Sequence, residues 1–67
     1  MVIDMQTFYD VQQLLKKFGL IIYFKDELNT IEMMNQELKD LHRSGLISNE
    51  EFMQARLILN QRKMGKL

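Results

Sequence analysis

The stretch LKDLHRSGLISNEEF, residues 38–52, contains the end of one helix and the beginning of the next. Gly45 suits the left-handed conformation in which many helices terminate. Ser48 and Glu51 then form the pattern of a capping box, in which each side chain accepts a hydrogen bond from the other residue's backbone N–H. The stretch therefore predicts two helices joined by a short turn, with the second helix beginning at about residue 49.

Apolar residues recur at helical spacing on both sides of this turn. They predict one helix over about residues 26–43, which Asp26 would cap, and another over about residues 49–64. The residues expected to face the core are Leu28, Ile31, Met34, Leu38 and Leu41 in the first helix, and Phe52, Ala55, Ile58 and Leu59 in the second.

A further amphipathic segment precedes these two, over about residues 7–18. Thr7 is its expected N-cap and Gly19 its expected stop. Its predicted core face consists of Phe8, Val11, Leu14, Leu15 and Phe18. The run that follows, Leu20–Phe24, favours a strand by composition. A single strand has no partner here, so we expect an extended connector packed under the helices.

These segments predict an all-α protein, a compact up-down-up bundle of three helices in which residues 1–67 form a single domain. Nine Lys and Arg balance nine Asp and Glu, and the 46% hydrophobic share is typical of a globular chain. The chain has no cysteine and no long apolar run, and Met1–Met5 lack a secretory pattern. We therefore expect a cytoplasmic protein with no disulfide and no membrane contact.

A set of segments spans all three predicted helices: Thr7–Leu15 followed by Gly19, then Glu37–Leu38 through Arg43–Gly45, and Leu57–Leu59. These segments resemble the YqgQ-like family of small bacterial proteins, whose function is not established. The resemblance covers about residues 7–62 and implies a compact three-helix bundle. It implies no reaction, and single-stranded nucleic-acid binding is only a suggested role for the fold. Residues 38–52 also resemble the helical hairpin of short SHOCT-type domains.

Residues suited to enzyme chemistry are few. His42 is the only histidine, so a zinc site would lack its usual ligands. We expect His42 at the boundary of a helix face near the C-terminal end, where a cation suits the helix dipole. Ser48 is expected to cap a helix, and the acidic pairs at the helix starts are explained by the same dipole. The sequence therefore predicts a protein that is not an enzyme, with no catalytic residue, cofactor or metal.

An up-down-up bundle would bring the C-terminal ends of the first and third helices together with the connector. Six of the nine basic residues would then gather at one end: Lys16, Lys17, Lys25, Arg62, Lys63 and Lys66. With stacking by Tyr9 or Tyr23, this end is a candidate platform for single-stranded nucleic acid. The alternative is that the cations only complement helix dipoles and the connector's aromatic residues plug the bundle.

A second candidate surface lies on the last helix. Met53, Leu57 and Met64 are well over 100° around the helix from its expected core face, and Met33 is similarly displaced on the preceding helix. Methionine is common on partner-binding surfaces. A chain of this size draws only about 3–5 kcal/mol from one core, which favours self-association. The alternative function is therefore a protein-interaction or homo-oligomeric adaptor, most simply a C2 homodimer.

Overall fold

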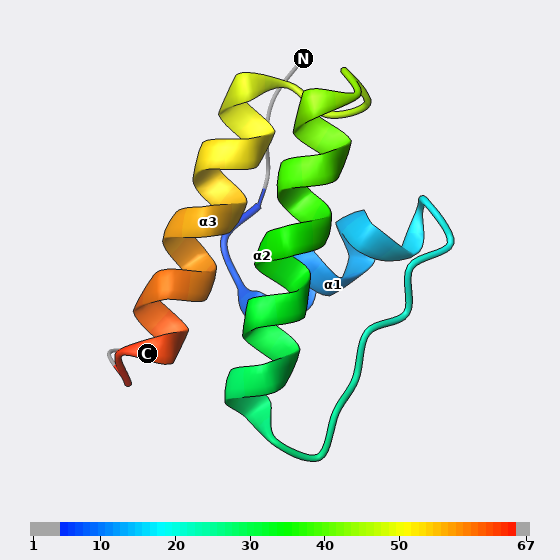
Figure 1. The fold of residues 1–67 in the computed structure, drawn as a ribbon. Helices are drawn as coiled ribbons and strands as arrows, with labels where there is room; N and C mark the ends of the chain where they lie inside the picture. The colour runs from blue at the N-terminus through cyan, green and yellow to red at the C-terminus, as the bar shows by residue number, and fades with distance from the viewer. Residues whose placement is uncertain (1–4, 66–67) are drawn as a thin grey trace.

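The computed structural model describes residues 5–65, which form three helices (Figure 1). They are α1 (Phe8–Lys16), α2 (Glu27–Arg43) and α3 (Asn49–Lys63). No strand occurs between residues 5 and 65. The predicted all-α three-helix bundle is therefore confirmed, and each predicted helix boundary lies within two residues of the observed one.

Capping boxes begin α1 and α3. The sequence predicted the box at Ser48 and Glu51, and it predicted Thr7 as the N-cap of the first helix. The Thr7 hydroxyl accepts a hydrogen bond from the Asp10 N–H at 3.2 Å, and the Ser48 hydroxyl accepts one from the Glu51 N–H at 3.1 Å. Asp10 in turn accepts hydrogen bonds from the backbone N–H groups of Gln6 and Thr7. These bonds favour the ionised carboxylate and so hold the pKa of Asp10 below its usual value.

The other helix ends follow the same local chemistry. Asp26 caps α2 by accepting a hydrogen bond from the Leu28 N–H at 2.9 Å. Gly19 and Gly45 adopt φ angles of +78° and +77°, the left-handed conformation that favours glycine after a helix. Short-range side-chain and backbone preferences therefore set the bounds of the helices.

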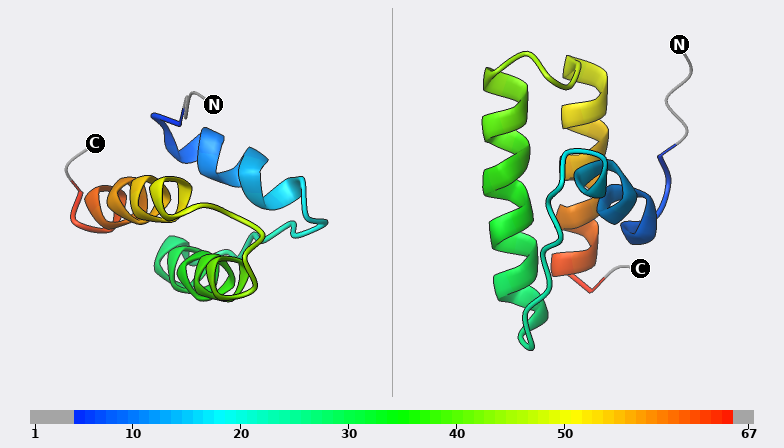
Figure 2. Two further views of the ribbon diagram at one scale, coloured as in Figure 1. Left: turned by 90° about the horizontal axis from the view of Figure 1, so that it is seen from above. Right: turned by 90° about the vertical axis from the view of Figure 1, so that its right-hand side faces the viewer.

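The helices α2 and α3 lie side by side and antiparallel, whereas α1 runs across them (Figures 1 and 2). The antiparallel pair follows from the short turn, residues 44–48, between α2 and α3. The connector from α1 to α2, residues 17–26, is longer. It does not fix the direction of α1, which therefore depends on how α1 packs against α2 and α3. As a result α1 does not run alongside α3 as an up-down-up course requires, and its C-terminal end lies away from that of α3.

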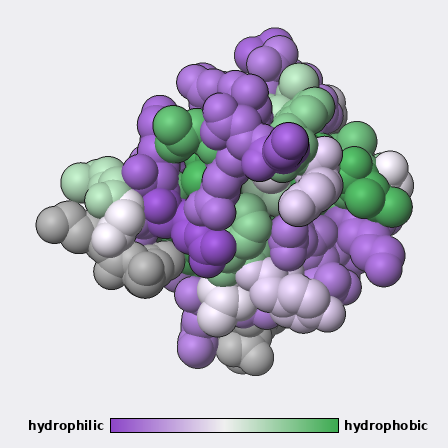
Figure 3. Space-filling model, turned by 90° about the horizontal axis from the view of Figure 1, so that it is seen from below, coloured by the Kyte–Doolittle hydropathy of each residue, from purple (hydrophilic) through white to green (hydrophobic). Residues whose placement is uncertain are grey.

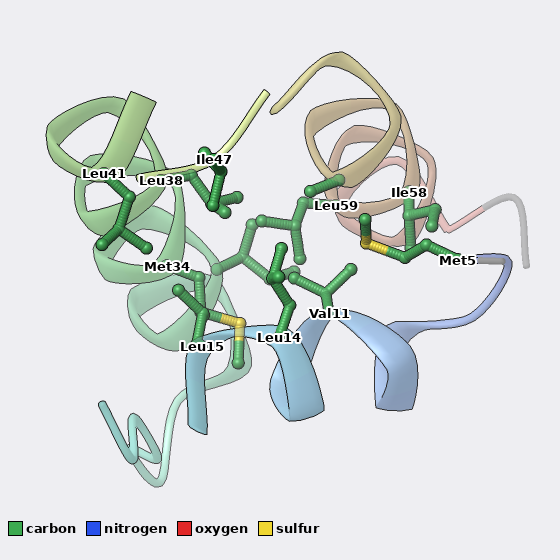
Figure 4. Close-up of a cluster of buried hydrophobic side chains, with 12 residues drawn as sticks. Met5, Val11, Leu14, Leu15, Met34, Leu38, Leu41, Ile47, Ile58 and Leu59 are labelled. Carbon is green, nitrogen blue, oxygen red and sulfur yellow. The ribbon is translucent and has the colours of Figure 1, made fainter. Parts of the chain in front are cut away.

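The core lies where α1 meets the α2–α3 pair (Figure 4). Ile31, Leu38 and Leu59 are completely enclosed, and Leu15 is 1% exposed. Each such side chain contributes roughly 1.5–3 kcal/mol relative to an exposed position. The rest of the cluster consists of Met5, Val11, Leu14, Met34, Leu41, Ile47, Ala55 and Ile58. Met5 and Ile47, which lie outside the helices, were not among the predicted core residues.

Two predicted core residues lie at the surface instead. Phe18 is 36% exposed and Leu28 is 49% exposed. α1 ends at Lys16, so Phe18 no longer continues its apolar face. Leu28 lies in the first turn of α2, beyond the point where α1 crosses this helix (Figure 1). Phe8 and Phe52 were also expected in the core, and they pack against it while partly buried.

Candidate functional site

The connector between α1 and α2 presents one apolar side to solvent. Leu20 and Ile22 pack against the core, while Ile21 and Tyr23 are 81% and 80% exposed. This alternation is that of an extended chain with one covered face. The connector was predicted to pack under the helices. It does so on the side of Leu20 and Ile22, whereas the side of Ile21 and Tyr23 faces solvent.

Thr30 of α2 holds the end of this connector in place. Its hydroxyl, on a side chain 3% exposed, accepts a hydrogen bond from the Phe24 N–H at 2.9 Å. The same oxygen lies 3.2 Å from the carbonyl oxygens of Phe24 and Asp26, to which it can donate its single proton. Thr30 was not among the predicted residues, although a polar β-branched residue beside the core residue Ile31 was an available signal.

A hollow of about 200 Å³ lies between α1 and the connector. Its polar lining consists of Gln12, Gln13, Lys16 and the Tyr23 ring, above apolar side chains from the core and connector. Among the described residues no acidic side chain lines it. The hollow therefore combines a cation, an exposed ring and amides that both donate and accept hydrogen bonds.

A second hollow of about 180 Å³ adjoins the first and shares Gln12 and Tyr23 with it. Its remaining lining is Phe8, Phe24, Lys25, Glu27, Thr30 and Arg62. The two hollows form one surface along the connector, with Lys16 beside one part and Lys25 beside the other.

Arg62 is already paired within this surface. Its Nε donates to Glu27 Oε1 at 2.8 Å, and its guanidinium carbon lies 4.7 Å from the centre of the Phe8 ring. The hydrogen bond with Arg62 lowers the pKa of Glu27, and the same bond raises the pKa of Arg62. Glu27 therefore offsets the charge of Arg62, and Lys25 is the remaining cation in the lining of the second hollow.

The predicted basic end is divided between two places. Lys16 and Lys17 lie at the C-terminal end of α1, which points away from the end of α3 that carries Arg62 and Lys63 (Figure 2). The crossing of α1 over α2 and α3 causes this separation. Lys66 lies outside the described residues. The end at which α2 begins and α3 ends has a mixed surface, with hydrophilic side chains between separate apolar patches (Figure 3).

Apart from Lys66, seven residues were predicted to bind nucleic acid, and four of them line the two hollows: Lys16, Tyr23, Lys25 and Arg62. The other three, Tyr9, Lys17 and Lys63, are exposed but line neither hollow. The structure therefore assembles a smaller group than predicted, along the connector instead of at one end of the bundle.

The predicted Met/Leu stripe is exposed along α3. Met53, Leu57 and Met64 are 69%, 50% and 68% exposed, whereas Ala55 and Ile58 on the opposite side lie in the core. Met33 of α2 is 38% exposed. This apolar face is therefore accessible, separately from the connector surface.

His42 takes part in the contact between α2 and α3. Its ring stacks on Phe52 with centroids 4.3 Å apart, and its Nε2 contacts Asn49 Oδ1. This position agrees with the expected boundary of a helix face. Within the described part of the chain no group of three or more His, Cys, Asp or Glu residues could hold a metal ion. No helix between residues 5 and 65 is long and apolar enough to cross a membrane.

The whole of this arrangement is shared with a known protein family. The model of the YqgQ-like family matches residues 5–64, which include the three helices and both hollows. Uncharacterized protein YqgQ of Bacillus subtilis strain 168 is 49% identical over 57 residues, which are 85% of this chain and 80% of that protein. The resemblance seen in the sequence is confirmed by both matches.

Proposed function

This chain belongs to the YqgQ-like family, and we propose that it is a non-enzymatic cytoplasmic module that binds single-stranded nucleic acid. The proposed surface is the face formed by α1 and residues 20–25. The observation that carries the proposal is the 200 Å³ hollow in which Lys16, two glutamine amides and the Tyr23 ring meet without an acidic neighbour in the described lining.

Each group on this surface has a counterpart in a single strand. The Tyr23 ring, 80% exposed, stacks a base, and stacking of this kind tolerates any base. Lys16, Lys17 and Lys25 neutralise phosphates on either side of it. The amides of Gln12 and Gln13 offer hydrogen bonds to the edge of a base that enters the hollow. Arg62 contributes less than the sequence suggested, because Glu27 already pairs with it.

The non-enzymatic part of the proposal rests on the surroundings of the one histidine. His42 stacks on Phe52 and contacts Asn49, and it lines neither hollow. The polar groups of the 200 Å³ hollow are amides, a lysine and a phenol. Such groups bind and orient a ligand by charge, hydrogen bonding and stacking.

The direct test is a fluorescence-anisotropy titration of a labelled oligothymidylate at several salt concentrations. Neutralisation of three phosphates predicts a slope of about −2 for the logarithm of affinity against the logarithm of salt concentration. A fourfold rise in salt concentration then weakens binding roughly twentyfold. Absence of binding at low salt would end the proposal.

Variants locate the surface. Tyr23→Leu removes the ring and is expected to cost about 1–3 kcal/mol of binding energy, a loss of about 5- to 150-fold in affinity, whereas Tyr23→Phe keeps the stacking. Lys16→Ala should reduce the salt slope by about 0.7. The matched control is Lys39→Ala, because Lys39 is an exposed lysine of α2 outside the connector surface, in a separate hollow where Glu32 and Asp40 are also part of the lining. Equal losses for both lysine variants would refute the assignment of the site.

A second candidate function, a protein-interaction or homo-oligomeric adaptor, rests on the exposure of Met53, Leu57 and Met64. Flexible methionine side chains adapt to a partner surface, which supports an interface on this side of α3. If α3 mediates self-association, Leu57→Asn should lower the mass measured by light scattering at high protein concentration. An unchanged mass would count against α3 as the interface between copies.

A further inference from the structure

One edge of the connector carries backbone groups without partners. In an extended chain, successive residues direct their N–H and C=O groups to opposite edges. Both backbone groups of Phe24 lie within hydrogen-bond distance of the Thr30 hydroxyl, so the edge that Phe24 shares with Ile22 faces α2, and the N–H and C=O groups of Ile21 and Tyr23 lie on the opposite edge. Within residues 5–65, none of these four groups has a hydrogen-bond partner. The Leu20 N–H donates to the Leu15 carbonyl at the end of α1, and within the same residues the backbone groups of Ile22 have no hydrogen-bond partner either.

The residues along this edge have the character of an unprotected strand. Residues 20–24 contain no charge, no proline and no glycine, and they are β-branched, aromatic or leucine. Ile21 and Tyr23 are also the most exposed of the large hydrophobic side chains that the structure describes. An extended apolar segment with free backbone groups on one edge is a template for pairing with another strand.

We propose that this edge pairs with the same edge of a second copy of the chain, antiparallel, about a two-fold axis at Ile22. In this register Ile21 of one copy lies opposite Tyr23 of the other. Each such pair exchanges two N–H···O=C hydrogen bonds, so the two pairs satisfy the N–H and C=O groups of Ile21 and Tyr23 in each copy. An axis at Ile21 or at Tyr23 would leave part of them unpaired.

Side chains and charges favour a second copy as the partner. The register places a β-branched residue opposite an aromatic ring twice, which is a favourable cross-strand combination. Lys16 and Lys17 precede residues 20–24, and Lys25, Asp26 and Glu27 follow them, with Glu27 paired to Arg62. Antiparallel pairing places the two lysines of one copy beside this charge-balanced end of the other, whereas parallel pairing would bring the two lysine pairs together.

The pairing uses the backbone edge and leaves the outer face of the connector accessible. The Tyr23 rings of both copies would lie on that face, so a dimer would extend the surface proposed for nucleic acid. The inference does not depend on that function, because its evidence is the free backbone edge and the alternation in burial.

The experiment is sedimentation equilibrium of the full chain from about 10 μM to about 1 mM, a range suited to the weak association that two short strands would give. We expect a concentration-dependent dimer. Ile21→Asn should raise the dimer dissociation constant about tenfold, because it weakens both cross-strand pairs. Leu46→Asn is the matched control, since it makes the same kind of change at an exposed residue of the turn between α2 and α3 and should leave the dimer intact.

Amide hydrogen exchange of the unmodified protein provides a second measurement that does not depend on how the variants fold. Raising the protein concentration should slow exchange at the amides of Ile21 and Tyr23 but not at the amide of Ile22, which points to the other edge. A chain that stays monomeric at about 1 mM would overturn the proposal. So would a dimer in which these two amides stay unprotected, or one that Leu57→Asn dissociates and Ile21→Asn does not.

Discussion

Replacing Thr30 with valine tests whether one buried hydroxyl fixes the connector. Valine has nearly the same shape, so the substitution removes the hydroxyl while keeping the packing. The Phe24 N–H then loses its acceptor, which lies at 2.9 Å in the unmodified protein. The Asp26 carbonyl keeps a partner, because it also accepts a hydrogen bond from the Thr30 N–H at 3.1 Å.

The expected loss of stability follows from the hydrogen bonds that Thr30→Val removes and keeps. A buried backbone donor left without an acceptor costs about 1–3 kcal/mol. The lower part of that range applies because the bond is only partly buried and water can reach it. The free energy of unfolding of a domain of this size is about 3–5 kcal/mol, so a loss of about 1–2 kcal/mol is large. It corresponds to a fall in Tm of about 5–15 °C.

Urea unfolding followed by circular dichroism measures the loss, and amide exchange at Phe24 reports on the connector itself. Thr30→Ser is the matched control, because it keeps the hydroxyl and loses only a methyl group. Equal stability of Thr30→Val and the unmodified protein, with unchanged exchange at Phe24, would refute the role given to Thr30. A loss for Thr30→Ser as large as that for Thr30→Val would assign the effect to packing instead.

Other perturbations test the core, the turns and the caps. Leu15→Ala should cost about 2–5 kcal/mol and leave the chain largely unfolded by circular dichroism, whereas Leu57→Ala, at a half-exposed position, should remain folded. Gly45→Ala should cost about 1–2 kcal/mol in urea unfolding through its φ of +77° alone, because the space for a Cβ is open; no loss would contradict the left-handed assignment. The pKa of Asp10 is lowered from 3.8 by backbone hydrogen bonds, so its stabilising contribution is present above that pH and is lost as the pH falls below it. The stability difference between the unmodified protein and Asp10→Asn should therefore shrink in acid, and a difference independent of pH would contradict the cap.

The helix bounds were predictable from the sequence because they depend on neighbouring residues. Ser48, Thr7 and Asp26 bind backbone groups within three residues of themselves, and Gly45 needs only its own backbone freedom. The exposure of Phe18 was not predictable in the same way, because it depends on α1 ending two residues earlier.

The direction of α1 was not predictable, since it depends on packing between residues distant in the sequence. A connector of ten residues allows α1 to lie along α3 or across it. The crossing separates Lys16 from Arg62 and brings Lys16 beside Tyr23 instead. Sequence patterns therefore identified most of the candidate residues. Which of them lie together in one hollow depends on how α1 crosses α2 and α3.

The most direct measurement of the central claim is a series of ¹H–¹⁵N correlation spectra recorded as a short oligothymidylate is added at low salt. The account predicts that the largest shift changes map to α1 and to residues 20–25, with Tyr23 and Lys16 among them, and that they disappear at high salt. Spectra that do not change, or changes confined to the Met53–Met64 side of α3, would contradict it.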